Sequence, residues 1–530
     1  MATAADITKR TGPGRWRLAI AALVVVAATA GIAWLWLDPR VEVMHRNFGT
    51  LAVSLLVYLG LSLWVLALSG WSWWRRLVLV ALPIVVYKAT VRQLSFTGDM
   101  VPVVEFFWDP TFAERLAAHA TAPAELPAVD ASVRLTDFPE YRGRNRDGVV
   151  VGPLLERDWQ VHPPKLLWRR PVGGGYASIA VAGNLAVTIE QRGDDEAVVA
   201  YDTATGNERW VHRYPAHFKE VLGGPGPRAT PTIADGLVYA LGATGRLTCL
   251  EAATGQLRWE TDILQDSENL RWGMTASPLV YDEVVVVNPG RQPPTASAAA
   301  LLALNRKTGA AVWKSGQHRA GYSSPMLVTL AGRRQVLLFD GEGVAGYDAA
   351  DGTELWRYPW LTQEFINVAQ PIVLPGDRLF ISSGYGVGCN LLQVRQHDGK
   401  WEVSPLWGNG SNLRALRCKF TSPVHYQGHI YGLDENGGLL TCLDAQTGQL
   451  RWKEGRYGHG QVLLTQGLLL ICSEKGQLAL VEATPEGHRE LGRFQALTPN
   501  PKNWNQHALA NGRVYVRNHE EMACYDLRAP

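Results

Sequence analysis

The chain has 530 residues and a net charge of only +2, with 19% of its residues charged. So balanced a charge argues against nucleic acid or another highly charged polymer as its partner. Its 53 glycines, 30 prolines and 20 tryptophans fit a fold with many turns better than a disordered chain.

Three apolar runs in the first hundred residues predict a membrane anchor over residues 18–92. Residues 18–37 and 49–69 are each long enough to cross a bilayer as a helix. The third run predicts a helix over about 77–91. Because it is short and ends in basic residues, it is either a third crossing or a buried or interfacial segment. The aromatic residues before it are typical of a membrane interface: Trp71, Trp73 and Trp74.

Basic residues predict the orientation of this anchor. Lys9, Arg10, Arg15 and Arg17 precede the first run, so residues 1–17 are expected in the cytoplasm. Three crossings place the rest of the chain on the periplasmic side of a bacterial inner membrane, and two crossings leave it in the cytoplasm. We favour three. A signal peptide that ends near Ala30 is a weaker alternative, because the apolar run continues beyond it.

Residues 93–133 are expected to connect the anchor to the rest of the chain. Helical spacing between Asp109 and Ala120 predicts a short amphipathic helix, and the Ala- and Pro-rich residues up to Val133 predict a linker. Residues 134–163 then form a lead-in segment, which contains Arg142-Gly-Arg-Asn-Arg-Asp-Gly148.

One pattern returns through the remainder of the chain, for example in Tyr201-Asp-Thr-Ala-Thr-Gly-Asn-Glu-Arg-Trp210. An acid or amide accepts hydrogen bonds from the amides just ahead, and a glycine supplies the positive φ of a tight turn. The Trp offers a flat surface to a neighbouring unit. Each copy therefore predicts a β-hairpin. The turn glycines are Gly206, Gly255, Gly309, Gly352 and Gly448.

Complete copies recur at intervals that leave room for two earlier strands, such as those around Asp235-Gly236. Four short strands per period predict one blade of a β-propeller. A degraded copy runs to Trp407, and Leu491 replaces Trp in the copy after Trp452. The last copy stops at Tyr525-Asp526, so we expect the strand around Trp168 to complete it and close the ring.

The predicted fold class is therefore all-β: an eight-bladed propeller over residues 164–530, preceded by transmembrane helices. The outer strands are expected to carry docking tryptophans, which are Trp168, Trp210, Trp259, Trp313, Trp356, Trp407 and Trp452.

These copies resemble the tryptophan-docking motif of the pyrroloquinoline quinone (PQQ) repeat family, Ala-x-Asp-x-x-Thr-Gly-x-x-x-Trp, from roughly Pro164 to Asp526. The lead-in resembles the Arg-Gly-x-x-Arg-Asp-Gly stretch of many bacterial membrane and secreted members. The family includes quinoprotein alcohol and glucose dehydrogenases and the non-enzymatic propeller lipoprotein of the outer-membrane barrel-assembly machinery. The resemblance implies a quinoprotein-like propeller and no single activity.

The enzymes of this family set criteria for a catalytic site. Several of them hold PQQ beneath a disulfide between adjacent cysteines and beside a calcium ion, which needs several oxygen ligands. This chain has no Cys-Cys pair, and no matching motif supplies the ligands. The leading hypothesis therefore expects no catalytic residue, metal or cofactor. PQQ and calcium belong only to the alternative.

Six cysteines fall into two groups. Cys249, Cys442 and Cys524 share one slot in different blades and are expected to be small buried residues. Cys389 and Cys418 lie in adjacent units, and a disulfide between them stays open.

Residues just before the innermost strands are expected to line one mouth of the propeller's channel. Their cationic and aromatic side chains suit an anionic ligand such as a quinone tricarboxylate, whereas the alternative is an ordinary solvated mouth. They are Tyr176, Arg228, Arg271, Trp272, Tyr322, Asn367, Lys419, His459 and His507.

Two functional hypotheses follow. The leading one is a non-enzymatic scaffold that presents blade loops to protein partners at the cell envelope. The alternative is a membrane quinoprotein dehydrogenase that oxidises an alcohol or sugar with PQQ and calcium and passes the electrons to ubiquinone. Fold alone does not decide between them.

Overall fold

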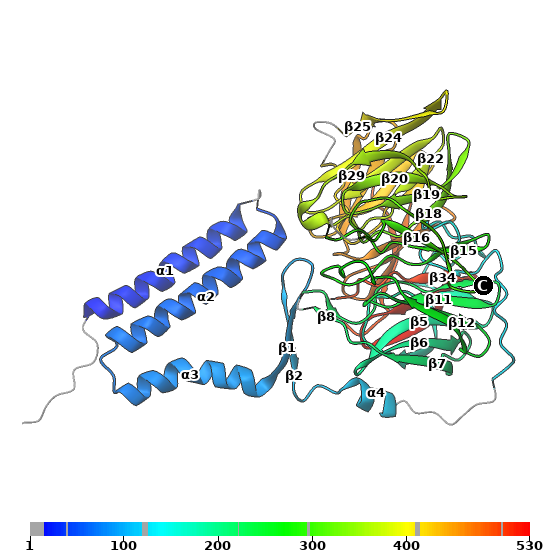
Figure 1. Ribbon diagram of the computed structural model, residues 1–530. Helices are drawn as coiled ribbons and strands as arrows, with labels where there is room; N and C mark the ends of the chain where they lie inside the picture. Colours follow the sequence, from blue (N-terminus) through cyan, green and yellow to red (C-terminus); the bar gives the residue numbers. More distant parts are fainter. Residues whose placement is uncertain are drawn as a thin grey trace, which may run out of the picture. The chain divides into compact units, whose positions relative to one another are not determined.

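The computed structural model describes residues 15–38, 41–118, 126–220, 222–293, 297–408, 414–499 and 502–530. The chain forms two compact units, Met1–Pro110 and Thr111–Pro530 (Figure 1). The predictions made for residues 1–14 and for the linker over residues 119–125 lie outside the described residues.

The N-terminal unit contains helices α1 (Arg15–Leu37), α2 (Val43–Leu68) and α3 (Trp73–Thr90). The predicted pair of long apolar helices is confirmed, since α1 and α2 are both long and apolar enough to cross a membrane. Helix α3 is shorter and contains Pro83. It leads directly into an antiparallel hairpin of β1 (Val91–Phe96) and β2 (Pro102–Phe106).

Side-chain hydrogen bonds link these helices to one another. At the start of α1, Arg17 donates from Nη1 to the carbonyl of Leu68, at 3.2 Å, and Trp64 donates to the carbonyl of Arg17, at 2.7 Å. Helices α1 and α2 are therefore antiparallel. Tyr58 in α2 donates to the carbonyl of Val80 in α3, at 2.9 Å.

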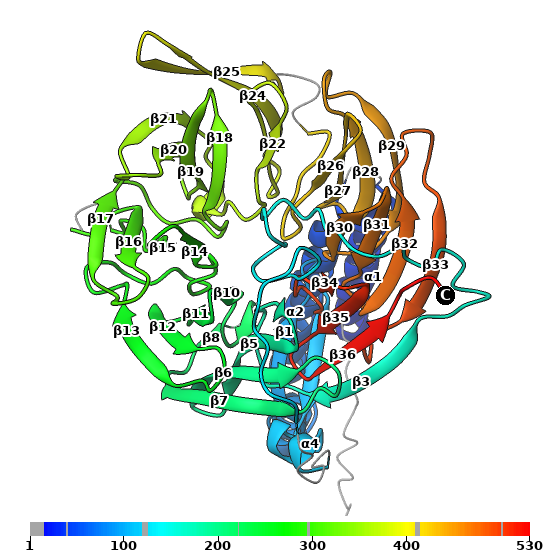
Figure 2. The same ribbon diagram turned by 90° about the vertical axis from the view of Figure 1, so that its right-hand side faces the viewer.

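The second unit begins with α4 (Phe112–Ala118) and contains eight four-stranded antiparallel sheets arranged as a ring (Figure 2). The predicted eight-bladed propeller is thus confirmed. From the axis outward, blades 1 to 4 are β4 (Ala180–Ala182), β5 (Leu185–Arg192), β6 (Asp195–Asp202) and β7 (Glu208–Pro215); β10 (Thr232–Ala234), β11 (Leu237–Leu241), β12 (Arg246–Glu251) and β13 (Leu257–Asp262); β14 (Leu279–Tyr281), β15 (Val284–Val287), β16 (Leu301–Asn305) and β17 (Ala311–Ser315); and β18 (Met326–Leu330), β19 (Arg333–Phe339), β20 (Gly343–Asp348) and β21 (Glu354–Pro359).

The remaining four blades complete the ring. They are β22 (Ile372–Leu374), β23 (Arg378–Ser383), β24 (Gly388–His397) and β25 (Lys400–Trp407); β26 (Val424–Tyr426), β27 (His429–Asp434), β28 (Leu439–Asp444) and β29 (Leu450–Arg456); β30 (Gln461–Thr465), β31 (Leu468–Cys472), β32 (Gln477–Glu482) and β33 (Glu490–Gln495); and β34 (Ala508–Ala510), β35 (Arg513–Arg517), β36 (Glu521–Asp526) and β3 (Lys165–Pro171). Outside the blades lie a short strand pair, β8 (Lys219–Glu220) with β9 (Gly224–Pro225), and a 3-10 turn, η1 (Gln363–Phe365).

The ring closes as predicted, because β3 pairs with β36 and supplies the outer strand of blade 8. Trp168 lies opposite Cys524 in this pairing. Because β3 covers β36, the last strand of the chain has no exposed edge at the closure.

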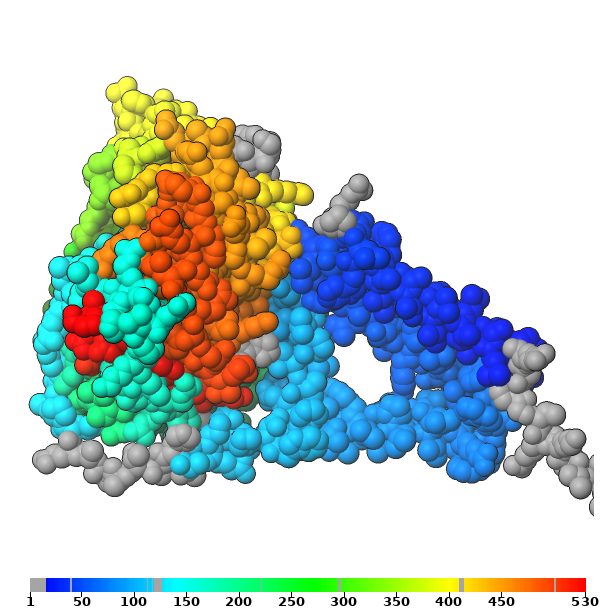
Figure 3. Space-filling view, turned by 180° about the vertical axis from the view of Figure 1, so that it is seen from behind, coloured from blue at the N-terminus to red at the C-terminus, as the bar shows by residue number. Residues whose placement is uncertain are grey.

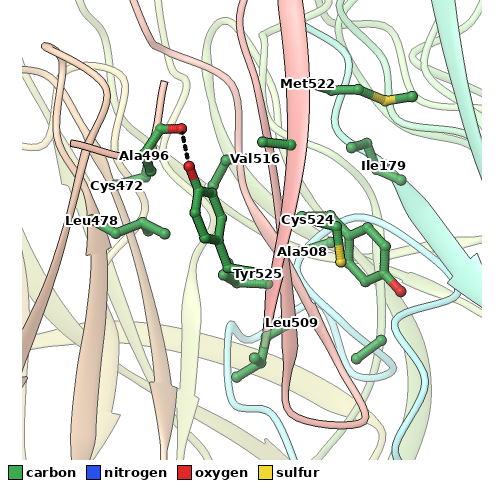
Figure 4. Close-up of a cluster of buried hydrophobic side chains, with 14 of the residues drawn as sticks. Ile179, Cys472, Leu478, Ala496, Ala508, Leu509, Val516, Met522, Cys524 and Tyr525 are labelled. Carbon is green, nitrogen blue, oxygen red and sulfur yellow. Dashed lines mark hydrogen bonds between the residues drawn. The ribbon is translucent and has the colours of Figure 1, made fainter. Parts of the chain in front are cut away.

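Alternation along β36 divides the core of blade 8 between its two neighbours. Figure 4 shows Tyr525 pointing toward blade 7, where its hydroxyl donates to the carbonyl of Ala496, at 2.7 Å. The preceding side chain, Cys524, points to the other side, toward Ile179, as does Met522. This period of two packs each blade against both neighbours.

The turns of the repeat have the predicted chemistry. In blade 1, Asp202 Oδ1 accepts from the backbone N–H groups of Ala204 and Thr205, at 3.1 and 2.9 Å, and from the Thr205 hydroxyl, at 2.9 Å. Gly206 has φ +69° and donates to the Asp202 carbonyl, at 2.8 Å. The acid and the glycine therefore close the turn together.

Five docking tryptophans lie against the turn glycine of the following blade. A Cβ at each of these glycines would come under 3.0 Å from the indole ring, so only glycine fits. The pairs are Trp168 with Gly206, Trp210 with Gly255, Trp259 with Gly309, Trp313 with Gly352, and Trp407 with Gly448. Trp356 differs, since its indole N–H bonds Gln335 in its own blade, at 2.7 Å.

The small residues that pair with the tryptophans explain the shared cysteine slot. Cys249 lies opposite Trp259, and Cys442 lies opposite Trp452. As predicted, Cys249, Cys442 and Cys524 are buried, and burial raises the pKa of the Cys249 thiol to about 12. Cys389 and Cys418 are also thiols and share one buried cluster.

Blade 7 departs from the sequence prediction for its outer strand. The register places Gly492, and not Leu491, in the slot that Trp occupies elsewhere, opposite Leu480. Trp159 of the lead-in packs over Gly492 and contacts Phe494, with 5.5 Å between ring centres. An indole from outside the blade therefore fills the slot. In Figure 3 the lead-in surrounds the C-terminal residues, consistent with the bridge between Leu155 and Arg528.

Candidate functional site

The candidate site lies on the axis of the ring, where the innermost strands begin. A belt of side chains links one blade to the next at this level. The Thr230 N–H donates to Ser277 Oγ, and the Ser277 N–H donates to Ser324 Oγ, both at 2.9 Å. The belt continues through Gln370, whose N–H donates to Ser422 Oγ, at 2.9 Å. These buried side chains satisfy backbone groups that a strand ladder leaves unpaired.

The lead-in segment closes one end of the axis, and its trace crosses the centre of the ring in Figure 2. Its backbone pairs with two of the innermost strands, because Phe138 bridges Val181 in blade 1 and Val149 bridges Leu464 in blade 7. We call residues 134–150 the plug.

Two arginines of the plug project into the axis and are almost fully buried. Arg142 donates from Nη1 to the Val462 carbonyl and to Gln506 Oε1, both at 3.2 Å, and from Nη2 to the Pro423 carbonyl, at 2.9 Å. It therefore joins blades 6, 7 and 8.

Arg146 makes equivalent contacts on the other side of the axis. Its Nη1 donates to the carbonyls of Ser277 and Pro325, at 2.9 and 3.0 Å, and its Nη2 to that of Pro278. Its Nε pairs with Glu140, at 2.5 Å. Because five N–H donors in a fixed plane suit several carbonyls at once, the two arginines act as spokes between blades. The Arg-Gly-x-x-Arg stretch is thus a closure and not a catalytic motif.

The other end of the axis, which we call the aromatic end, contains most of the predicted mouth residues. Tyr176 stacks on Trp504 with 5.2 Å between ring centres, and Trp504 contacts Phe420 at 4.8 Å. Phe420 contacts His459 at 5.3 Å. The Arg228 guanidinium lies 5.4 Å from the centre of the Tyr176 ring. These contacts place cations over the faces of neutral rings.

A second group continues the aromatic end across blades 3 and 4. Trp272 meets Tyr322 edge to face at 5.7 Å, and the Arg271 guanidinium lies 5.0 Å from the Trp272 ring. Gly223 joins the two groups, since a Cβ there would come within 3.0 Å of Trp272 and of Arg228. Burial raises the pKa of Tyr322, so its phenol stays neutral at physiological pH.

Two predicted mouth residues lie outside this cluster. The Asn367 amide donates to the carbonyls of Asp340 and Trp360, and its oxygen accepts from Ser383, at 2.7 Å, so it is a structural bridge. His507 is buried within the ring, and burial lowers its pKa to about 3. Neither ring nitrogen of His507 has a hydrogen-bond partner among the described residues.

Phe420 and Trp504 are cluster members that the sequence prediction missed. Both stand four residues before the start of an innermost strand, at the same offset as Tyr176, Arg228 and Tyr322. A fixed distance of four residues before the strand would therefore have found both. The prediction accepted any residue just before the strand, and it named the neighbouring Lys419, whose Nζ lies 5.5 Å from the Phe420 ring centre.

The carboxylates of Glu220 and Glu364, near the aromatic end, bond groups of the protein itself. Glu220 accepts from the N–H groups of Leu222 and Gly223, at 2.7 and 2.6 Å, and Glu364 pairs with Arg271, at 2.7 Å. Within the described ranges, no group of three or more His, Cys, Asp or Glu side chains comes together as metal ligands. Because calcium takes six to eight oxygen ligands, these two carboxylates alone do not make a calcium site.

Comparison with known families gives one broad match. A family model described as outer membrane protein assembly factor BamB matches residues 159–267 and 194–454, which together span more than half of the chain.

Individual relatives include both enzymes and assembly factors. Quinoprotein alcohol dehydrogenase PedH of Pseudomonas putida is 31% identical over 146 residues, or 25% of this chain and 23% of that protein. Outer membrane protein assembly factor BamB of Burkholderia pseudomallei is 26% identical over 247 residues, or 44% and 58%. The chain therefore matches less than two thirds of the length of either relative.

A solved structure shares the architecture. Quinohemoprotein alcohol dehydrogenase from Comamonas testosteroni superposes with a TM-score of 0.52 at 12% identity, covering 79% of this chain and 84% of that one. At this identity the likeness shows the fold and does not extend to an activity.

Proposed function

Because the chain belongs to the family described as outer membrane protein assembly factor BamB, we propose that it is a membrane-anchored, non-enzymatic scaffold that binds protein partners at the cell envelope. The observation that carries this proposal is how the polar groups on the axis are used. The plug arginines bond backbone carbonyls, and Glu220 and Glu364 bond groups of the ring's own loops. Such contacts hold the ring together and use the polar atoms that make them.

A scaffold needs an exposed apolar surface, and we assign this role to the outer side of the lead-in. Leu135, Leu154 and Val161 are 65, 72 and 65% exposed. All three belong to the lead-in, and exposed apolar side chains of this kind suit contact with a protein partner. Because the lead-in is bonded to the innermost strands, this surface is held rigidly.

We place the propeller on the periplasmic side of a bacterial inner membrane. Arg17 bonds the end of α2, and Arg76 donates to the Leu66 carbonyl, at 2.6 Å, so basic residues gather at one end of the helical unit. The positive-inside rule assigns that end to the cytoplasm. Helix α3 begins at this end, and a third crossing by α3 would carry the chain to the periplasm.

The alternative function, a PQQ-dependent alcohol or sugar dehydrogenase, draws support from the aromatic end. Stacked rings such as Tyr176 and Trp504, with Arg228 beside them, suit a planar anion. The similarity to quinoprotein dehydrogenases agrees with this. The carboxylates give it less support, because Glu220 and Glu364 already bond groups of the protein itself.

The two functions are separated by titrating the full-length protein, in detergent micelles, with PQQ and calcium in a calorimeter and then screening for dye-linked oxidation of alcohols and sugars. The scaffold proposal expects no saturable heat and no turnover. Micromolar binding accompanied by turnover would overturn it.

The partner surface is tested separately by placing a photo-crosslinking residue at Leu154 in cells. We expect one discrete adduct with an envelope protein. The matched control carries the same residue at Gln396, which is also exposed but lies on β24. Equal adducts from both positions, or none from Leu154, would contradict the assigned surface.

A further inference from the structure

The β1–β2 hairpin is the part of the N-terminal unit that neither the anchor nor the propeller explains. No linker separates it from α3, because Thr90 ends the helix and Val91 begins β1. Its far end is tied back to the same point, since the Phe107 N–H donates to the Thr90 carbonyl, at 3.0 Å, and Arg92 donates to the Phe107 carbonyl, at 2.6 Å.

The tip of the hairpin is bonded to a second helix. The side-chain amide of Asn47 donates to the carbonyl of Asp99, at 2.7 Å, in the first turns of α2. The hairpin therefore runs from the end of α3 to the start of α2. Because both points are ends of helices on the same side of the unit, the hairpin lies across that side and not along the helices (Figure 1).

The two faces of this hairpin differ in chemistry. The cross-strand pairs Leu94 with Val104 and Phe96 with Pro102 make one face apolar, whereas Gln93 pairs with Glu105 on the other face. Phe106 extends the apolar face, and Trp108 stacks on it with 4.7 Å between ring centres and 6° between planes.

Part of this apolar surface is open. Val104 is 40% exposed, Phe107 is 55% and Trp108 is 67%. An isolated two-stranded hairpin is only marginally stable in water, so an open apolar face needs a cover.

We propose that the apolar face of the β1–β2 hairpin lies on the outer surface of the membrane, with Val104 and Trp108 in the boundary between headgroups and acyl chains. The proposal rests on the proposed membrane anchoring of α1 and α2 and on the proposed third crossing by α3. We infer that lipid covers this face because β1 continues directly from α3, and a strand that starts where a membrane helix ends begins at the bilayer surface. Aromatic rings are favoured at that depth. The wet headgroup region also tolerates the unpaired strand edges, which the hydrocarbon core does not.

On this proposal the hairpin lies flat on the membrane surface and fixes the depth at which the chain leaves the bilayer. Flanking cations fit the position, since Lys88 and Arg92 follow the apolar part of α3 and can reach lipid phosphates. A partner protein or the propeller on the same face are the competing outcomes.

The test uses a fluorophore attached to a single introduced cysteine in the full-length protein, in nanodiscs of phosphatidylcholine brominated either near the headgroup or deep in the acyl chain. The variants are Val104→Cys and Trp108→Cys, with Gln93→Cys as the matched control on the opposite face. Leu56→Cys, in the middle of α2, reports on the anchor itself. The six native cysteines are buried, and the unmodified chain serves as the labelling blank.

We expect headgroup-level bromine to quench positions 104 and 108 roughly twofold or more over position 93, because an interfacial face enters the bilayer boundary by about 5–10 Å. Deep bromine should quench position 56 most strongly. If position 56 is quenched and position 104 is not, the hairpin proposal fails while the anchor stands. If none is quenched, the anchoring fails and the hairpin proposal fails with it.

Discussion

The two ends of the ring axis both contain arginines, but the arginines have different surroundings and different roles. At the plug, Arg142 and Arg146 are buried, and their Nη groups donate to backbone carbonyls in blades 3, 4, 6 and 7 and to the Gln506 side chain in blade 8. At the aromatic end, Arg228 stacks on Tyr176, whose hydroxyl has no hydrogen-bond partner among the described residues. An arginine surrounded by carbonyls is a structural tie, whereas rings with unpaired polar atoms leave capacity for a ligand.

The largest effect is expected at the plug. Replacing Arg146→Met leaves the carbonyls of Ser277 and Pro325 without this donor and removes the guanidinium that pairs with the largely buried Glu140 carboxylate. Removing one member of a buried ion pair costs about 3–5 kcal/mol of unfolding free energy. Denaturant unfolding of the purified protein measures this loss.

Two further variants control for that result. Arg144→Met, two residues away and exposed, should change stability by no more than about 0.5 kcal/mol. Glu140→Leu combined with Arg146→Met should recover part of the loss, since it removes the unpaired carboxylate. Equal effects of Arg144→Met and Arg146→Met would show that the plug is not a structural tie.

The next effect is acid sensitivity at the middle of the axis. Burial, with a smaller contribution from the charge of Arg142, lowers the pKa of His507 to about 3. An unfolded histidine titrates near 6.5, so below that pH the unfolded chain binds a proton that the folded chain does not. Stability therefore falls as the pH drops from 6.5 toward 3, by about 2 kcal/mol at pH 5.

Replacing His507→Gln should remove this part of the pH dependence. The measurement is the unfolding free energy of both proteins between pH 7.5 and pH 5. His425, on the innermost strand of blade 6, supplies the comparison, because burial also lowers its pKa but the contributing charges are those of Arg378 and His429. An unchanged slope in His507→Gln would place the acid sensitivity elsewhere.

A smaller effect is expected in the belt that separates the two ends. Ser277→Ala removes the acceptor of the buried Thr230 N–H. A buried donor without a partner costs about 1–3 kcal/mol of unfolding free energy. Ser297→Ala, at an exposed position, is the matched control for loss of a hydroxyl. If the two variants unfold alike, the belt contributes nothing to closure.

These ends also differ in how far the sequence could predict them. The repeat predicted the blades, the turns and the closure at Trp168, because each depends on residues that lie within one hairpin or one period. An offset of four residues before the innermost strand finds five members of the aromatic end, which are Tyr176, Arg228, Tyr322, Phe420 and Trp504, whereas Trp272 and His459 stand at other offsets.

The plug could not be predicted in the same way. Arg142 and Arg146 bond carbonyls more than 130 residues away, and backbone carbonyls carry no signature in the sequence. The same reason explains Trp159, which fills a slot in blade 7 from outside the repeat. Local patterns reveal contacts within a unit, while contacts from an added segment depend on the assembled ring.

The smallest effect is expected from an unpaired hydroxyl at the aromatic end. Tyr176 packs edge to face on His519 at 4.3 Å, and burial raises the pKa of its phenol, so the hydroxyl is buried, neutral and without a partner among the described residues. Tyr176→Phe keeps the ring and removes only that group. We expect the unfolding free energy to stay the same or to rise by up to about 1 kcal/mol, since an unsatisfied buried hydroxyl stabilises nothing.

The matched control is Tyr525→Phe, whose hydroxyl donates to the Ala496 carbonyl, at 2.7 Å. That variant should lose about 1 kcal/mol of unfolding free energy, because it removes a hydrogen bond from the core. Denaturant unfolding of both variants gives the comparison. If Tyr176→Phe destabilises the chain as much as Tyr525→Phe does, the aromatic end is satisfied in solution like the plug, and the contrast between an open end and a closed one disappears.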